Sequence, residues 1–148
     1  MPQRITFWPA GHGDYEFALE LHLMTMRPLT AELMTWDESK QTAAFARQWQ
    51  VREAEIILCD GRDVGWMQAR ETISEVFLQQ LFIAPDCQRR GIGSEALAQL
   101  LAQWDSVGKP VTLAALRNNP ARRLYERFGF AVVDDIGVKV RMVRRPPK

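Results

Sequence analysis

The sequence predicts a mixed α/β (α+β) fold. Short runs of branched and aromatic residues, typical of strands, alternate with longer stretches that repeat apolar residues at helical spacing. The chain has 148 residues, of which 47% are hydrophobic and 25% charged. This size and composition are typical of a globular protein with one core. We therefore expect a single domain over residues 1–148.

The first third of the chain predicts one strand and two helices. Asp14 and Asp37 lie at the starts of the two helical stretches and are suitable N-caps. Pro28 is expected to end the first helix, because proline has no N–H to donate. The three elements are expected at residues 4–8, 14–26 and 36–50.

The rest of the chain predicts six strands and two helices. Asp60-Gly61 is a hairpin-turn sequence, and three consecutive antiparallel strands are expected around and after it. Pro120 suits the first turn of the last helix, and Gly129 suits its end. The strands are expected at residues 55–60, 64–72, 76–84, 111–116, 130–135 and 138–143, and the helices from about residue 92 and over 121–128.

Residues 88–97, QRRGIGSEAL, form a basic, glycine-rich turn between an apolar strand and a helix. The helix is indicated by the apolar series Leu97, Leu100, Leu101 and Trp104. A helix N-terminus offers unpaired N–H groups and the positive end of the dipole, and glycines let an anion come close. We therefore expect this turn to bind the phosphate or pyrophosphate of a cofactor.

Composition excludes several classes of protein. The net charge of +1 gives no reason to expect nucleic-acid or membrane-surface binding, and no apolar run reaches membrane-spanning length. Residues 1–14 do not resemble a signal peptide. Cys59 and Cys87 are expected to be reduced thiols of a cytoplasmic protein. No Cys/His cluster has metal-ligand spacing, so no metal is expected.

Two motifs resemble those of the GNAT superfamily of acyl-CoA-dependent N-acyltransferases. QRRGIG at residues 88–93 is similar to the family's pyrophosphate-loop pattern, (Gln/Arg)-x-x-Gly-x-(Gly/Ala). NNPARRLYERFGF at residues 118–130 is similar to its second cofactor segment. The resemblance covers residues 56–143 well and implies a mostly antiparallel sheet of six to seven strands flanked by about four helices. Trp36-Asp37-Glu38 is also similar to a signature in one subset of the family.

A dinucleotide-binding reading is the main rival. Residues 91–96, GIGSEA, also satisfy the pattern G-x-G-x-x-(G/A). A Rossmann domain would carry an acidic residue at the end of the next strand, but residues 114–117 read Ala-Ala-Leu-Arg. Three antiparallel strands also precede the motif. A nicotinamide enzyme is therefore the weaker alternative, as is a tight turn that binds nothing.

The resemblance implies that acetyl-CoA is the cosubstrate and assigns its binding to three segments. Loop amides would hold the pyrophosphate, strand backbone groups would pair with the pantetheine arm, and an asparagine at the next helix would also hold that arm. For the asparagine, helix capping is the competing role, so either of two residues remains open. The implied cofactor residues are Leu81, Phe82, Ile83, Gln88, Arg89, Arg90, Gly91, Ile92, Gly93, Ser94 and Asn118 or Asn119.

The resemblance implies that Tyr125 is catalytic. Its hydroxyl would face the cofactor sulfur and either protonate the departing thiolate or stabilise it by hydrogen bonding. The alternative is a core aromatic residue. In the implied reaction an amine nitrogen attacks the thioester carbonyl directly. Many relatives carry a catalytic Glu where this strand reads Gln79-Gln80. A neutral amide cannot serve as the base, so the candidate substitutes are Glu71, Glu75, Asp37 or a chain of waters. The two histidines, His12 and His22, are separated in the sequence.

The first two helices and their connection are expected to form the acceptor side. Met26, Trp36 and Glu75 are the candidate substrate-binding residues. Met24 and Met34 join Met26 and Trp36 as candidates for an adaptable apolar pocket, and the core is the alternative location of these four residues. Trp66 on the hairpin strand is a further pocket candidate. The expected acceptor is a primary amine on a small molecule or a protein. The alternative function is a catalytically inactive CoA-binding module, and a homodimer through the terminal strands is expected by analogy.

Overall fold

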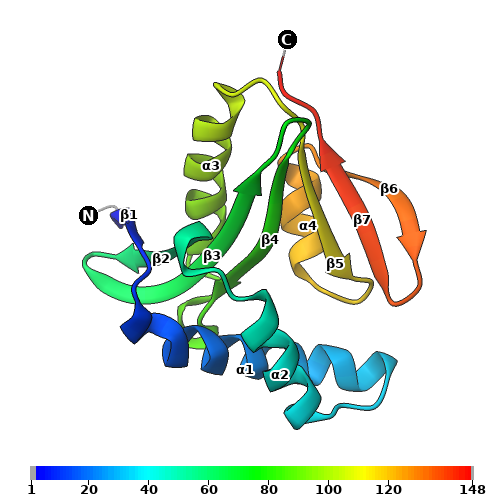
Figure 1. Cartoon of the computed structure of the whole chain (residues 1–148). Helices are drawn as coiled ribbons and strands as arrows, with labels where there is room; N and C mark the ends of the chain where they lie inside the picture. The colour runs from blue at the N-terminus through cyan, green and yellow to red at the C-terminus, as the bar shows by residue number, and fades with distance from the viewer. Residues whose placement is uncertain (1–2, 148) are drawn as a thin grey trace. The chain divides into compact units, whose positions relative to one another are not determined.

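The computed structural model describes residues 3–147, and its mixed α/β architecture confirms the expected fold class. Figure 1 shows the order of the elements along the chain. The strands are β1 (Ile5–Pro9), β2 (Ala54–Cys59), β3 (Arg62–Glu71), β4 (Val76–Ile83), β5 (Val111–Leu116), β6 (Ala131–Ile136) and β7 (Lys139–Arg144). The helices are α1 (Tyr15–Leu33), α2 (Glu38–Gln48), α3 (Ile92–Asp105) and α4 (Ala121–Arg127).

In the described part of the chain, seven strands form one sheet in the order β1-β2-β3-β4-β5-β7-β6. The pairs β1–β2, β2–β3, β5–β7 and β6–β7 are antiparallel, whereas β4 and β5 are parallel. The residues group into two compact units. The first unit contains residues 3–68 and 80–96, and the second contains residues 69–79 and 97–147. Both β3 and β4 therefore contribute residues to each unit.

Helix α1 corrects one sequence-based expectation. It continues through Pro28 to Leu33, so the prediction that Pro28 ends the helix is wrong. Proline removes one backbone donor, but the helix closes normally beyond it, where Met34 N donates to Thr30 O at 2.8 Å. Thr30 is buried, so packing of the last turn offsets the lost bond. Asp14 stands before α1 but does not cap it, because its carboxylate accepts from Gly11 N at 2.8 Å.

The first unit is built around an aromatic core. Helices α1 and α2 lie beside each other (Figure 1) and bury their apolar side chains against β2, β3 and the end of β4. The β2–β3 hairpin turns at Asp60 and Gly61, whose positive φ values of 53° and 82° suit the expected two-residue turn. The buried cluster consists of Ala18, Leu21, Phe45, Ile56, Trp66 and Phe82.

A buried polar residue connects α2 to β3. Gln68 is 1% exposed, and its Nε2 donates to the Gln48 carbonyl at 2.9 Å. Its Oε1 accepts from Gln50 N at 3.2 Å. Because a buried amide without partners is costly, these bonds fix where α2 ends relative to β3. Asp37 caps the other end of α2, as expected, by accepting from Lys40 N at 3.1 Å.

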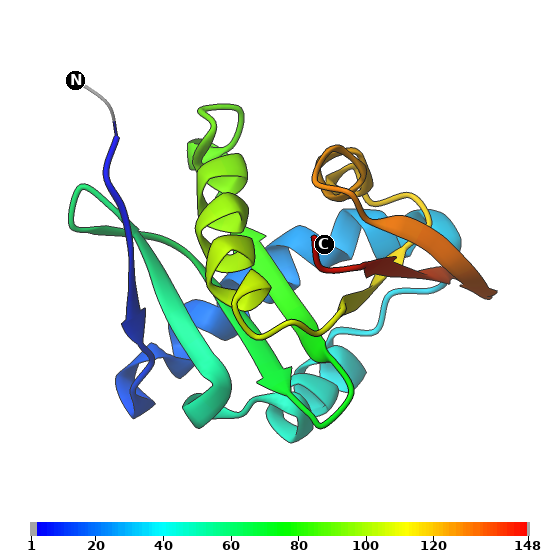
Figure 2. The ribbon, with the colours of Figure 1, turned by 90° about the horizontal axis from the view of Figure 1, so that it is seen from above.

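In the second unit, β5 is the central strand between β4 and β7. β4 pairs with β5 at Val76–Val111 and Phe77–Thr112, and β7 pairs with β5 along its whole length. Helix α4 lies on one face of the β5–β7–β6 part (Figures 1 and 2). The chain reverses from β6 to β7 at Gly137, which has a positive φ of 87°, as a tight turn requires.

Candidate active site

The segment between β4 and α3 has a backbone suited to holding an anion. A 3-10 turn, Pro85–Cys87, follows β4, and α3 begins at Ile92. Arg89 and Gly91 have positive φ values of 65° and 78°. Left-handed residues interspersed in such a turn direct successive N–H groups to one side, and the first-turn amides of α3 add further donors. A Cβ on Gly91 would meet no heavy atom within 4 Å, so the approach to the backbone is open there.

The side chains of this loop have different surroundings. Gln88 Nε2 donates to the Ile83 carbonyl at 2.9 Å, which connects the first motif residue to the end of β4. Arg89 and Arg90 are exposed, whereas Ile92 is only 1% exposed. Ile92 can therefore offer a ligand its backbone but not its side chain. The loop combines exposed guanidinium groups with the N-terminal amides of a helix, an arrangement that suits phosphate groups.

Sequence reasoning missed Arg62, which begins β3. Burial raises the pKa of the Cys87 thiol, as do the hydrogen bond and the charge of Asp86, while the charges of Arg90 and Arg62 oppose that rise. Arg62 is therefore close enough to act electrostatically on the loop. The pairing of β3 with β4 explains the position of Arg62. Ala84 N, just after β4, donates to Val64 O at 2.8 Å, and this bond brings the start of β3 alongside the end of β4.

Sequence reasoning also missed Gly65, in the middle of β3. A Cβ at this position would lie 2.1 Å from the carbonyl oxygen of Phe82 on β4. The available signal was an isolated glycine inside a strand pattern, which indicates a bulge or a close backbone approach. Of the strand residues assigned to the pantetheine arm, Phe82 buries its side chain, and only its backbone remains a candidate for that role.

The residues expected to line an acceptor pocket differ in how deeply they are buried. Trp66 is 0% exposed and lies in the core, so its assignment to a pocket wall is wrong. Met26 packs against the core, whereas Met24 and Met34 are 53% and 49% exposed. The Nε1 atom of Trp36 is buried and has no hydrogen-bond partner among residues 3–147. The Nε1 atom of Trp66 is likewise buried without a hydrogen-bond partner among these residues.

His22 lies deeper than the sequence suggested. It is 6% exposed on α1, and its ring centroid lies 5.4 Å from that of Phe82 in an edge-to-face arrangement. The Phe45 ring lies 5.1 Å away on another side. This contact brings a titratable group from α1 against β4, the strand expected to bind the cofactor arm.

In the second unit, the two candidate asparagines differ. Asn119 Oδ1 accepts from Ala121 N at 2.9 Å, so it caps the start of α4, which was the alternative role. The Oδ1 atom of Asn118 is buried. The side-chain oxygen of Asn119 is thus already used inside the helix terminus.

Tyr125 is buried on α4, 6% exposed, with its ring 5.6 Å from that of Phe130 at an angle of 63°. Burial raises the pKa of its hydroxyl to about 12, because the phenolate would lose its hydration. The phenol is therefore neutral throughout the physiological range. A neutral hydroxyl can donate a hydrogen bond to a developing negative charge.

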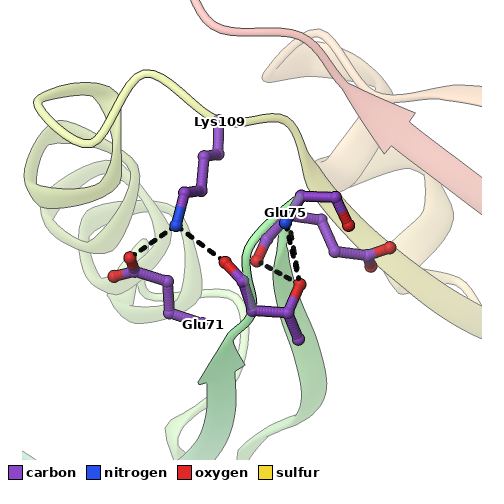
Figure 3. Close-up of polar contacts among 5 residues, drawn as sticks. Glu71, Glu75 and Lys109 are labelled. Atoms are coloured by element: carbon purple, nitrogen blue, oxygen red, sulfur yellow. Dashed lines mark hydrogen bonds and ion pairs between the residues drawn. The ribbon is translucent and has the colours of Figure 1, made fainter.

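The candidate bases Glu71 and Glu75 both have structural partners in the second unit. Lys109 Nζ lies between Glu71 Oε2, at 2.8 Å, and the Thr72 carbonyl, at 2.7 Å (Figure 3). Figure 3 also shows the Glu75 side chain directed away from Lys109; its carboxylate accepts from the Thr112 hydroxyl. These contacts connect the turn between β3 and β4 to Lys109 and to Thr112 on β5, and they do not single out either residue as a base.

Residues 3–147 contain no group of three or more His, Cys, Asp or Glu side chains that could hold a metal ion. Within the same residues, none of the helices combines the length and apolar character needed to cross a membrane. Cys59 and Cys87 are both free thiols, as expected.

Comparison with known proteins places the chain in a family. The model of the acetyltransferase (GNAT) domain matches residues 49–132, more than half of the chain. The human cysteine-rich protein 2-binding protein is 35% identical over 66 residues, which are 45% of this chain and 8% of that protein. This chain thus matches only a small part of that relative.

Two solved structures share the fold across nearly the whole chain. PH1933 from Pyrococcus horikoshii OT3 superposes with a TM-score of 0.76 at 18% identity, covering 98% of this chain and 100% of that chain. The PaiA N-acetyltransferase of Thermoplasma acidophilum, solved in complex with coenzyme A, superposes with a TM-score of 0.73 at 16% identity, covering 96% and 99%. Taken with the domain match, these findings show that the chain belongs to the GNAT acetyltransferase family.

Proposed function

We propose that this protein is an N-acetyltransferase that moves an acetyl group from acetyl-CoA to a primary amine by direct attack in a ternary complex. The observation that carries the proposal is the backbone from Arg89 to Ile92. There, two residues with positive φ precede the start of α3, a backbone suited to binding an anion, and the segment lies within the matched GNAT domain. We further propose that both units together make one acetyltransferase domain.

The proposed cofactor contacts follow from this loop and from the end of β4. The amides of residues 88–94 would bind the pyrophosphate, with Arg89 or Arg90 adding charge-assisted bonds. The backbone groups of Leu81, Phe82 and Ile83 would bind the pantetheine arm as a neighbouring strand would. Asn118 or Asn119 would complete the contacts to the arm, and the Asn119 oxygen also caps α4.

We propose that Tyr125 stabilises the departing thiolate by hydrogen bonding and does not transfer its proton completely. The support is its pKa of about 12. A thiol ordinarily has a pKa near 8.5, so full transfer would be uphill by roughly 3.5 pKa units, or about 5 kcal/mol. A donated hydrogen bond avoids this cost and still stabilises charge in the transition state.

The amine must lose its proton before it can attack the thioester carbonyl. Gln79 and Gln80 are neutral amides and cannot accept that proton, while Glu71 and Glu75 are engaged in the β3–β4 turn. We therefore propose that the acceptor enters as the free amine or is deprotonated through water. Proximity and orientation would then supply much of the rate acceleration.

The proposed acceptor is a primary amine on a small molecule or a protein, bound on the side formed by α1, α2 and their connection. Trp36 lies in this connection and supports the placement, because its Nε1 atom is buried without a hydrogen-bond partner among residues 3–147. The free thiols of Cys59 and Cys87 are consistent with the proposed cytoplasmic location. Dimerisation through the terminal strands remains part of the proposal.

Two measurements test the function. Ligands that bind only the folded state must raise its melting temperature, so CoA and acetyl-CoA should stabilise the protein and NAD(H) should not. Thiol release from acetyl-CoA across a panel of amines then separates an enzyme from the alternative, an inactive CoA-binding module. A thermal shift with NAD(H) alone would overturn the proposal. Stabilisation by CoA without thiol release above spontaneous hydrolysis would establish the alternative.

A further inference from the structure

The backbones of β3 and β4 come unusually close at Gly65 and Phe82. A Cβ on Gly65 would lie 2.1 Å from the Phe82 carbonyl oxygen, 3.1 Å from its carbonyl carbon and 3.0 Å from Cδ1 of Ile83. In protein structures, Cβ atoms essentially never come within 3.0 Å of a heavy atom that is not bonded nearby. Because the shortest contact is to backbone, no change of rotamer relieves it. Position 65 therefore accepts only glycine as long as Phe82 keeps its place.

A β-bulge accompanies this close approach. In the β2–β3 pair, Ile57 lies opposite Gly65 and Leu58 lies opposite Asp63, which leaves Val64 as an extra residue on β3. The Val64 carbonyl accepts from Ala84 N at 2.8 Å. The extra residue on β3 and the absence of a side chain on Gly65 together allow the β3 backbone to lie close to the last residues of β4.

Phe82 is held from both of its ends. Its ring centroid lies 5.4 Å from those of Trp66 and His22 in the aromatic core, and its carbonyl oxygen lies against Gly65. The next carbonyl, of Ile83, accepts from the Gln88 side chain at 2.9 Å. The positions of the last two carbonyl groups of β4 are therefore fixed by the packing of the Phe82 ring, by Gly65 and by Gln88.

The direction of one N–H group follows from this arrangement. A trans peptide is planar, so the N–H of Ile83 points opposite to the carbonyl of Phe82. Since that carbonyl points at Gly65, the Ile83 N–H points away from β3. A ligand with an amide carbonyl could accept from it, as a neighbouring strand would.

We infer that Gly65 is a positioning residue for the pantetheine arm of the cosubstrate. By accommodating the Phe82 carbonyl, it turns the Ile83 N–H toward an amide carbonyl of that arm. This inference rests on the proposed function, because it needs acetyl-CoA or CoA as the ligand. It assigns to Gly65 no direct contact with the ligand and no role in holding the phosphates.

The test compares Gly65→Ala with Gly13→Ala. The control also adds one methyl group to a glycine of the first unit, but nothing lies within 4 Å of the new Cβ. Calorimetric titration uses CoA and adenosine 3′-phosphate 5′-diphosphate, which keeps the phosphates and lacks the arm. Gly65→Ala should weaken CoA binding about tenfold, the order of one lost hydrogen bond, and change the affinity for the shorter ligand less than about twofold. Gly13→Ala should change neither affinity.

Two results for Gly65→Ala would overturn the inference and leave the proposed function standing. One is an equal loss of affinity for both ligands, which indicates general structural damage, and the other is no loss for either ligand. A second variant, Gly65→Ala/Ile83→Val, removes the contact with Ile83 Cδ1 and leaves the contact with the Phe82 carbonyl. It should not recover CoA affinity. Recovery would show that the side chain of Ile83, and not the peptide direction, is the constraint.

A measurement on the unmodified protein covers the case in which Gly65→Ala does not fold. The amide proton resonance of Ile83 should shift on addition of CoA and stay in place on addition of adenosine 3′-phosphate 5′-diphosphate. An Ile83 resonance that responds equally to both ligands, or to neither while CoA binds, contradicts the inference. If the unmodified protein binds neither ligand, the proposed function itself fails and the inference fails with it.

Discussion

Arg144 on β7 holds Asp105, the last residue of α3, through two contacts of 2.6 and 3.4 Å between the guanidinium and the carboxylate. The same guanidinium donates from Nε to the Phe128 carbonyl at 2.8 Å, just after α4. One side chain thus joins a strand and the ends of two helices in the second unit. The pair is mostly buried, with side-chain exposures of 16% for Arg144 and 30% for Asp105.

We expect Arg144→Ala to lower the free energy of unfolding by about 2–4 kcal/mol, because it leaves the Asp105 carboxylate and a backbone carbonyl without their donor. Arg144→Lys should recover only part of this loss, since an ammonium cannot reproduce the fork of donors. Urea denaturation measures both variants. The control is Lys109→Ala, which breaks a more exposed pair with Glu71 and should cost about 1 kcal/mol or less. Equal losses in the two alanine variants would contradict the assigned importance of Arg144.

The loop glycine can be tested against a glycine with the same backbone strain. Gly91 and Gly108 have φ values of 78° and 77°, and a Cβ on either meets nothing within 4 Å. Gly91→Ala and Gly108→Ala should therefore lose similar stability, about 1 kcal/mol each. Only Gly91→Ala should weaken CoA binding, because its methyl group would stand where phosphate oxygens approach. Titration with CoA checks this, and equal affinities of the two variants would contradict the proposed pyrophosphate loop.

The buried hydroxyl of Tyr125 predicts a loss of stability at alkaline pH. Its pKa is about 12 in the folded protein and near 10 in an unfolded chain. Between these values the unfolded state has released the proton and the folded state keeps it, so stability falls as pH rises from about 10 to 12. The loss should reach about 2–3 kcal/mol. Tyr125→Phe should remove this pH dependence, whereas Tyr15→Phe, which removes the chain's other phenolic hydroxyl, should retain it.

The same substitution tests the proposed role of Tyr125 in the reaction. Tyr125→Phe should lower kcat at least about tenfold, the order expected for one lost hydrogen bond to a developing charge. CoA affinity should change by less than about twofold, since the hydroxyl is assigned to the transition state. Steady-state rates and CoA titration separate the two effects. An unchanged kcat would place Tyr125 among the core aromatic residues.

The absence of an acidic residue at Gln79 and Gln80 predicts a particular pH dependence of kcat/KM. If no side chain accepts the amine proton, kcat/KM should rise about tenfold per pH unit from near pH 6 up to the pKa of the acceptor amine. Acceptors of lower pKa should reach their plateau at correspondingly lower pH. A plateau at one pH for all acceptors would instead reveal a protein base. His22→Phe would then show whether the buried histidine beside Phe82 is that base.

The elements of the fold follow closely from local sequence patterns. The apolar series Leu97, Leu100 and Leu101 predicted the buried face of α3, and all three are at most 2% exposed. The Asp60-Gly61 pair predicted the hairpin, and Asp37 predicted the start of α2. These signals act over a few residues, so they can be recognised without knowing the tertiary structure. Pro28 shows the limit, because buried Thr30 beyond it sustains the helix that proline was expected to end.

The sequence by itself determined the order of strands and helices, the glycine-rich turn before α3 and the family resemblance, because each depends on neighbouring residues. Only the tertiary structure decided which polar groups are engaged: Asn119 in a helix cap, Glu71 and Glu75 in a turn, and Gln88 on the Ile83 carbonyl. It also revealed why Gly65 must be glycine. Some of these contacts join residues that are distant in the chain, and others are chosen from several possible local partners. Packing decides which contacts form, and the spacing of residues along the sequence does not reveal that choice.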